Sequence, residues 1–233
     1  MRCDNRRVLT EIRHRLAVLA GRIAGEATRR VGRGGGTALP GLVASALAPN
    51  LVEVLGGEPG HGAVTVTGTN GKTTTTHLLA AIAREAAMLP LTNRTGSNLE
   101  RGLVTAYLDV TGPGGHLQNA DRCLGVWEVD EAVLPKVFGR LRPRAAVFLN
   151  LFRDQLDRYG EIDSVADGWR SMIEDASWSP TLVLNADDPS VAQLAEGAPG
   201  TVVWFGIDDP GVALPETEHA SDARFCRCGS RFT

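Results

Sequence analysis

The feature that most constrains the fold is the segment 64–74, VTVTGTNGKTT, in which an apolar β-branched run leads into a glycine-containing turn. A Lys-Thr pair follows the turn, and a helical pattern continues from there to residue 87. A strand that passes into a helix through so short a turn is the repeating unit of α/β folds. The segment therefore predicts a parallel sheet with this turn at the carboxyl end of one strand.

Short apolar runs alternate with helical patterns along most of the chain. The runs that predict strands are residues 63–67, 123–129, 145–150, 181–185 and 201–205. The patterns that predict helices are residues 72–87, 130–138, 164–176 and 189–196, with a shorter one near 42–47. Residues 103–110 fit either state. The alternation predicts a three-layer α/β domain in which helices cover both faces of a mostly parallel sheet.

Residues 68–74 have the composition of a phosphate-binding loop. Backbone N–H groups at the start of the expected helix can point at a polyphosphate, Lys72 can neutralise its charge, and the Thr73 hydroxyl can ligate Mg²⁺. The general motif has a further glycine where this chain has Val66, and a glycine-rich helix start that binds nothing is the alternative. We predict a P-loop NTPase-like site whose binding residues are Gly68, Thr69, Asn70, Gly71, Lys72, Thr73 and Thr74.

An acidic residue is expected across the site from Thr73, because a magnesium ion needs further oxygen ligands. Glu128 ends an apolar run and is the first acid at the carboxyl end of that expected strand. We predict that Thr73 and Glu128 hold Mg²⁺, and that Lys72 and Glu128 act in catalysis. Asp130 and Glu131 could share the metal or hold a water, and the alternative for all three acids is that they cap the next helix.

Two further strand ends carry side chains that suit a nucleotide. Asn150 ends the run AVFLN, and Asn185 ends TLVLN, with Asp188 soon after it. Amide and carboxylate groups at such positions can contact a base or a ribose, so we predict that these three residues bind the nucleotide. Asn and Asp are also favoured in turns for purely local reasons, which is the alternative.

The first 33 residues are strongly basic. They hold nine arginines and three acids, and this balance of +6 leaves −9 for the rest of a chain whose net charge is −3. Residues 5–31 predict an amphipathic helix with apolar positions at Ile12, Leu16, Leu19, Ile23 and Ala27. A peripheral contact with an anionic surface such as a membrane is one interpretation, and a solvated helix face is the other.

The remaining composition indicates a compartment. The N-terminus lacks the apolar core of a signal peptide, and no run approaches the roughly 18 apolar residues of a membrane span. Four unevenly spaced cysteines do not make a disulfide framework. We expect a cytoplasmic protein that has no nucleic-acid partner.

The order and spacing of the motifs resemble the central ATPase domain of Mur ligases and folylpolyglutamate synthases. The shared motifs are TGTNGKTT at 67–74, the strand that ends in Glu128, NLFRDQLDRYG at 150–160 and LNADDP at 184–189. Within that superfamily the chain more closely resembles MurT-type subunits of lipid II isoglutaminyl synthase. The stretches that carry this narrower resemblance are 32–41, 48–50, 92–102 and Glu-Val-Asp-Glu at 128–131.

The resemblance implies an ATP- and Mg²⁺-dependent amide ligase that activates the α-carboxylate of D-glutamate in the stem peptide of lipid II. Ammonia would come from glutamine through a glutaminase subunit of the GatD type, and the product would be D-isoglutamine in the peptidoglycan precursor. Lipid II and that glutaminase are therefore the expected partners. The alternatives are another Mur or folylpolyglutamate-type amide ligase, or a non-catalytic ATP-binding fragment.

Three departures from the family pattern bear on these expectations. Gln155 stands where most Mur ligases have a metal-binding His, as it does in MurT-type proteins. No lysine lies near Trp169 and Arg170, where other Mur ligases carry a carbamylated lysine. Cys226 and Cys228 are candidate Zn²⁺ ligands, but they supply only two of the four that a structural zinc needs.

These observations divide the chain into three parts. Residues 1–45 would form the basic helix and a glycine-rich loop, residues 46–210 the ATP-binding domain, and residues 211–233 the start of an incomplete cysteine-containing, zinc-ribbon-like insertion. The C-terminal ligase domain that the resemblance predicts would follow residue 233. We therefore expect a fragment or a truncated reading frame that binds ATP but by itself amidates lipid II poorly or not at all.

Overall fold

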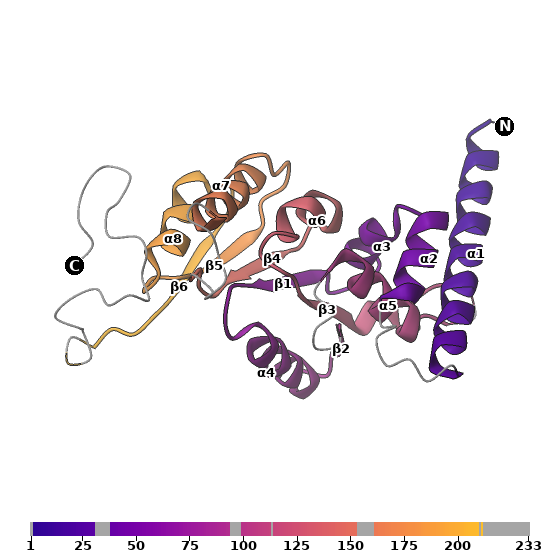
Figure 1. Ribbon diagram of the computed structural model, residues 1–233, viewed down its shortest axis with the longest axis horizontal. Helices are drawn as coiled ribbons and strands as arrows, with labels where there is room; N and C mark the ends of the chain where they lie inside the picture. Colours follow the sequence, from indigo (N-terminus) through magenta and orange to yellow (C-terminus); the bar gives the residue numbers. More distant parts are fainter. Residues whose placement is uncertain are drawn as a thin grey trace.

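The computed structural model describes residues 2–30, 38–93, 99–112, 114–152, 161–209 and 211. Its helices are α1 (Arg2–Arg30), α2 (Leu39–Leu47), α3 (Leu51–Gly57), α4 (Lys72–Glu85), α5 (Glu100–Val110), α6 (Leu134–Leu141), α7 (Glu161–Glu174) and α8 (Pro189–Ala192), with 3₁₀ turns at Ala120–Arg122 and Gln193–Gly197. Its strands are β1 (Ala63–Thr67), β2 (Leu89–Thr92), β3 (Cys123–Glu128), β4 (Ala145–Phe148), β5 (Thr181–Asn185) and β6 (Val202–Phe205). Figure 1 shows α1, α2, α3 and α5 gathered at one end of the molecule.

The strands form a single parallel sheet. Within the described residues, six strands follow the order β2-β3-β1-β4-β5-β6, and every neighbouring pair is parallel. In the central strand β1, Val66 is level with Glu128 of β3 and with Val147 of β4. The carboxyl ends of these three strands therefore meet at one edge of the sheet, where ligands bind in open α/β folds.

Apolar side chains fill both sides of the sheet. On one side, Val66, Val126 and Val147 pack together with Leu79 of α4. On the other side, Phe148 belongs to the larger core cluster, which also includes buried residues of α3, α5, α6 and α7. Figure 1 accordingly shows α4 on one face of the sheet and α6 and α7 on the other. The predicted three-layer α/β class is confirmed.

The structure adds two elements that the sequence analysis does not predict. Strand β2 contains Pro90, which lacks an N–H, and it lies at the edge of the described sheet, where it pairs with β3. A proline is tolerated at such a sheet edge, although it weakens the sequence signal. Helix α3 ends in two glycines, which are weak helix formers. Residues 103–110, which fit either state in sequence, belong to helix α5.

Two expected helices have different bounds. Residues 131–133 form a turn, so the helix expected over 130–138 begins at Leu134 as α6, where Pro135 occupies one of the first positions. Proline is favoured there because that N–H has no partner in a helix. The helix expected over 189–196 is α-helical only to Ala192 and continues as a 3₁₀ turn. The other predicted helices and strands are present, with ends shifted by a few residues.

Helix α1 is confirmed as a helix, but its packed side is not the one that the apolar pattern indicates. Ile12, Leu16, Leu19 and Ile23 are exposed, whereas Ala17 and Val18 are buried, together with His14, Gly21 and Gly25. A Cβ added at Gly21 would lie 2.9 Å from the Pro40 carbonyl oxygen of α2. Small residues therefore allow α1 and α2 to approach closely, and this contact decides which side of α1 faces the protein.

The helices at this end of the molecule share the core of the sheet domain. Ala17 of α1, Ala44 of α2 and Leu103 of α5 belong to one buried cluster with the sheet residues. The division drawn after residue 45 falls inside α2. Within the described residues, no single helix has the length and apolar composition to cross a bilayer, although α2 and α3, bent by 101° to each other, meet that test as a pair.

Candidate functional site

The loop between β1 and α4 depends on two glycines. Gly68 follows β1 with φ of 137°, and Gly71 precedes α4 with φ of 84°. Residues other than glycine rarely adopt these left-handed conformations. A Cβ at Gly68 would also lie 2.9 Å from the backbone nitrogen of Asn150. The glycines therefore let the loop turn tightly and direct the N-terminus of α4 toward the carboxyl edge of the sheet.

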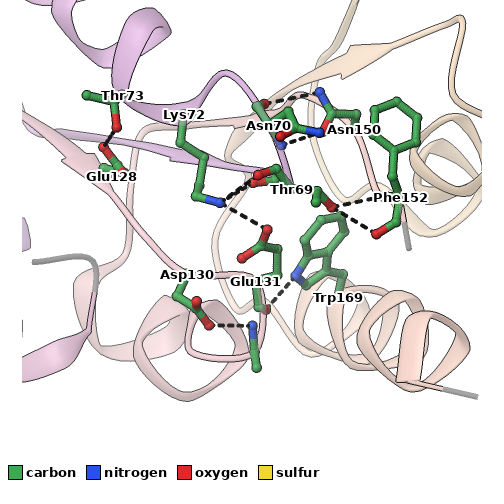
Figure 2. A network of polar contacts seen from close by, with 12 residues as sticks. Thr69, Asn70, Lys72, Thr73, Glu128, Asp130, Glu131, Asn150, Phe152 and Trp169 are labelled. Carbon is green, nitrogen blue, oxygen red and sulfur yellow. Dashed lines mark hydrogen bonds and ion pairs between the residues drawn. The ribbon is translucent and has the colours of Figure 1, made fainter. Parts of the chain in front are cut away.

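Lys72 folds back over this loop, as Figure 2 shows. Its Nζ donates to the Gly68 carbonyl at 2.5 Å and to the Thr69 carbonyl at 3.2 Å, and it forms an ion pair with Glu131 Oε1 at 3.0 Å. The Lys72 and Glu131 side chains are only 13% and 18% exposed. The ammonium is thus held at the centre of the loop, beside a carboxylate from the segment that follows β3.

Thr73 and Glu128 form the second contact across the site. The Thr73 hydroxyl donates to Glu128 Oε2 at 2.8 Å, and Glu128 is buried at the end of β3 (Figure 2). A hydroxyl and a carboxylate oxygen are ligands that suit Mg²⁺, which keeps several waters and takes few protein ligands. Within the described residues, no group of three or more His, Cys, Asp or Glu side chains could hold a metal. The pair fits a magnesium ion that is completed by water and phosphate.

Asn93 fixes the backbone of Glu128. Its Nδ2 donates to the Glu128 carbonyl at 2.9 Å, and its Oδ1 accepts from the Glu128 N–H at 2.9 Å. Asn93 is buried directly after β2. The sequence does not mark this residue as part of the site, because the pattern of residues 89–92 does not predict β2 and so does not place Asn93 beside β3. The sequence signals were that Asn93 directly follows an apolar run and lies within 92–102, one of the stretches that carry the narrower resemblance.

Asn150 holds the loop rather than facing outward. Its Oδ1 accepts from the Asn70 N–H at 2.8 Å, and its Nδ2 donates to the Asn70 carbonyl at 3.1 Å. Thr69 adds a second brace, since its hydroxyl accepts from the Phe152 N–H at 3.0 Å (Figure 2). The predicted contact of Asn150 with a base or a ribose would require its amide to leave Asn70.

Asn185 and Asp188 also have local partners. Asn185 donates to the Leu149 carbonyl at 2.8 Å. Asp188 caps α8 and accepts from the Leu151 N–H at 2.6 Å. Burial raises the pKa of the Asp188 carboxyl, and the backbone N–H groups that bind the ionised form oppose this rise. Both side chains brace the strand ends behind the loop between β1 and α4, which is the local role expected of Asn and Asp in turns.

Trp169 positions the segment that carries the other two acids. Its indole Nε1 donates to the Glu131 carbonyl at 2.9 Å, and the side chain is fully buried in the core. Asp130 accepts from the Ala132 N–H at 3.1 Å, which is a local turn contact. Of the two acids after Glu128, therefore, Glu131 lies in the site through Lys72, whereas the described contact of Asp130 is with its own turn.

Several predicted residues lie outside the described part of the chain. Gln155 falls between residues 152 and 161, and Cys226 and Cys228 fall after residue 211. The zinc prediction and the division at residue 211 therefore stay predictions. Thr74 lies exposed in the first turn of α4, next to the Lys72 and Thr73 side chains that face the site.

The chain is similar to known proteins in both sequence and fold. The profile of the Mur ligase middle domain matches residues 66–228. The relatives include proteins named lipid II isoglutaminyl synthase (glutamine-hydrolyzing) subunit MurT. The one from Staphylococcus aureus (strain COL) is 32% identical over 91% of this chain and 46% of its own length. The one from Streptococcus pneumoniae (strain ATCC BAA-255 / R6) is 35% identical over 83% of this chain and 40% of its own length. The chain thus spans about half the length of these relatives.

Solved structures with the same fold include two MurF ligases. The MurF structure from Acinetobacter baumannii has a TM-score of 0.54 at 18% identity and covers 73% of this chain and 35% of its own. The MurF ligase from Thermotoga maritima, solved in complex with ADP, has a TM-score of 0.53 at 18% identity and covers 70% of this chain and 37% of its own. At these identities the likeness concerns the fold alone.

Proposed function

The chain belongs to the Mur ligase family, and from that premise we propose that it is the nucleotide-binding part of an ATP-dependent carbon–nitrogen ligase in peptidoglycan synthesis. The observation that carries the proposal is the pair of contacts Lys72–Glu131 and Thr73–Glu128 at the carboxyl edge of the sheet. A lysine and a hydroxyl at the start of a helix, each opposite a carboxylate, are suited to the phosphates and the magnesium of a nucleotide.

Each of these residues has a separate role in the proposed reaction. The first backbone N–H groups of α4 receive the phosphates, which helix N-termini favour. Lys72 exchanges Glu131 for the β- and γ-phosphates, and Thr73 and Glu128 hold Mg²⁺, which supplies charge neutralisation when it is bound. Asn93 and Asn150 keep Glu128 and the loop in place. The chain thereby positions the γ-phosphate before any acceptor enters.

The chemistry that this arrangement serves is carboxylate activation. A carboxylate oxygen of the acceptor attacks the γ-phosphorus, ADP leaves, and an acyl phosphate forms. Ammonia then attacks the acyl carbon, phosphate leaves, a proton is released, and an amide remains. Such a reaction depends on aligned phosphates and screened charge more than on covalent protein chemistry, which is what the site offers.

The finer proposal concerns the substrate and the partner. We propose that the carboxylate is the α-carboxylate of D-glutamate in the lipid II stem peptide, and that a glutaminase subunit of the GatD type supplies ammonia from glutamine. Support comes from the relatives that are named subunits of a glutamine-hydrolysing lipid II isoglutaminyl synthase. Because the chain spans 46% of one such relative, the substrate and the partner of the whole enzyme remain part of this proposal.

In the experiment, the protein as it occurs in the cell is incubated with lipid II, ATP, Mg²⁺, glutamine and a GatD-type glutaminase. Mass spectrometry of the stem peptide then reports D-isoglutamine. We expect Lys72→Ala to lower the amidation rate by about two orders of magnitude or more, as the loss of a transition-state charge partner does. Lys136, the only other lysine in the sequence, is exposed on α6 and provides the matched control Lys136→Ala. Amino-acid addition without amidation would contradict the finer proposal.

A further inference from the structure

Helix α1 presents a stripe of large apolar side chains to solvent. The members of this stripe, which we call the α1 stripe, are between 49% and 64% exposed: Val8, Leu9, Ile12, Leu16, Leu19 and Ile23. Positions three and four apart lie on one side of a helix, so the stripe is continuous over about four turns. Single exposed apolar residues are ordinary, whereas a continuous row of six is a feature of binding surfaces.

The α1 stripe is not the side through which α1 packs on the rest of the protein. The opposite side of α1 packs on the protein through small residues, Ala17, Val18 and Gly21, beside α2 and α5. His14, also on that side, is buried and bonds to the Gly115 carbonyl at 2.7 Å. Figure 1 shows α1 as the outermost element at its end of the molecule. The α1 stripe thus lies mainly on the exposed side of α1, although Ile23 at its end also borders a pocket with Pro40 of α2 and Leu108 of α5.

Arginines lie along both sides of the α1 stripe. Helix α1 contains eight arginines and three acidic residues, a net charge of +5. Arg13, next to Ile12, and Arg15, next to Leu16, lie on opposite sides of the stripe and are exposed, although Arg13 Nε also donates to the Leu47 carbonyl of α2. Arg15 pairs with Glu11 at 2.9 Å, yet its side chain remains 59% exposed. Long basic side chains in this position can place their charged ends at a phosphate layer while their stems cover apolar surface.

We propose that α1 is an interfacial helix that binds this protein to the surface of an anionic lipid bilayer. The helix would lie parallel to the surface, with the α1 stripe among the upper acyl chains and Arg13 and Arg15 at the lipid phosphates. An anionic bilayer is the occupant that the positive charge of α1 favours, because arginines attract lipid phosphates. Two α1 helices that met through their stripes would bring like-charged arginines together, so a second copy is disfavoured.

The extent of the α1 stripe favours the membrane over a partner helix. Leu9, Ile12, Leu16, Leu19 and Ile23 keep the alternating spacing of three and four residues, but the next positions in that spacing are Asn5 and Glu26. The pattern thus covers about two heptads, whereas coiled coils are typically sustained over three or four. An interfacial helix has no such length requirement.

Vesicle co-sedimentation tests the proposal directly. Purified protein is mixed with vesicles of phosphatidylcholine that contain phosphatidylglycerol, and separately with phosphatidylcholine alone. We expect binding to the anionic vesicles that weakens with salt, and little binding to the neutral ones. The double variant Leu16→Asp/Leu19→Asp should weaken binding by about tenfold or more, and Arg13→Gln/Arg15→Gln should weaken it by about tenfold and reduce the salt dependence.

A second pair of exposed apolar residues provides the control. Leu78 and Ile82 on α4 are 60% and 65% exposed, so Leu78→Asp/Ile82→Asp makes the same chemical change elsewhere. Equal loss in both double variants, or no binding of the wild type to anionic vesicles, would overturn the proposal. Concentration-dependent dimerisation that needs Leu16 and Leu19, without vesicle binding, would assign the α1 stripe to a second copy instead. The vesicles contain neither ATP nor lipid II, so the result does not depend on the proposed function.

Discussion

At the residue scale, two acids pair separately with the first two residues of α4. Glu128 faces the Thr73 hydroxyl, and Glu131 faces the Lys72 ammonium. Glu131 pairs with the Lys72 ammonium, which the phosphates of a nucleotide would also need, and buried Trp169 holds the Glu131 backbone in that position. Glu131 should therefore compete with the nucleotide, whereas Glu128 should assist it through the metal.

Replacing Glu131 tests this competition. Glu131→Gln removes the charge but keeps the size, so we expect ATP to bind more tightly without Mg²⁺, by about fivefold, the equivalent of one partly buried ion pair of about 1 kcal/mol. Calorimetric titration in EDTA measures the change. Asp130→Asn, one position earlier, is the matched control and should leave the affinity unchanged. Weaker binding in Glu131→Gln would show that Glu131 acts on the nucleotide and not against it.

Asn93 is the second residue whose loss should be felt at the site. Asn93→Ala removes two hydrogen bonds to the backbone of Glu128 and leaves two buried polar groups without these partners. We expect the free energy of unfolding to fall by about 1–3 kcal/mol, because buried polar groups that lose their partners are costly. Urea denaturation measures this fall. Magnesium-dependent ATP binding should weaken in the same variant, and unchanged stability and binding together would contradict the role given to Asn93.

At the element scale, close helix contacts hold α1, α2 and α5 to the sheet domain. A Cβ at Gly41 of α2 would lie 1.8 Å from the Arg101 carbonyl oxygen of α5, which is backbone and cannot turn away. At the same end, His116 joins α1 to the region after α3, because its ring nitrogens lie 2.8 Å from Glu11 and 3.0 Å from Glu58. One contact depends on shape and the other on charge, so the two respond to different perturbations.

Gly41→Ala should destabilise the protein. The added methyl group has to push α2 and α5 apart, and we expect a loss of about 1–3 kcal/mol in the free energy of unfolding. Gly139→Ala in α6 is the control, since a Cβ there meets nothing within 4 Å and alanine favours a helix. That variant should be neutral or slightly stabilising. Equal stability of the two variants, measured by urea denaturation, would argue against the close packing of α2 on α5.

The His116 contact should make stability depend on pH. The hydrogen bond to Glu11 raises the pKa of His116 above its usual 6.5. Protonated His116 therefore contributes stability in full below pH 6.5, and the contribution is lost as the pH rises through the raised pKa. The side chain is nearly half exposed, so we expect under about 1 kcal/mol. Thermal melts at pH 6 and pH 8.5 should show a smaller difference for His116→Gln than for the wild type, and an equal difference would contradict this account.

At the scale of the whole molecule, a six-stranded parallel sheet brings distant parts of the described chain to one edge. The tight loop before α4 was predictable because Gly68, Gly71, Lys72 and Thr73 lie within six residues and form a local signal, whereas its binding of phosphate stays a prediction. Glu128 was predictable because it ends an apolar run. The brace by Asn93 was not, since it depends on the edge strand β2, whose sequence LPLT carries a proline. A role that depends on the pairing of two strands cannot be predicted from the sequence of either strand by itself.

For the N-terminal helix α1, the sequence predicts the element but not which of its sides packs on the protein. The three- and four-residue spacing of Ile12, Leu16 and Leu19 correctly predicts a helix but not its packed face. That face is chosen by Gly21 and its close approach to Pro40, a three-dimensional fit that periodicity does not reveal. Because the opposite side of α1 packs on the protein, the α1 stripe remains exposed for the proposed membrane contact.

The central claim is that this chain contains a working nucleotide site, and calorimetric titration with ATP tests it most directly. We expect binding in the presence of Mg²⁺ that weakens in EDTA and is lost in Lys72→Ala, while Lys136→Ala binds like the wild type. Circular dichroism confirms that each variant is folded. A well-folded wild-type chain that does not bind ATP, or a Lys72→Ala variant that binds it equally well, would contradict the account.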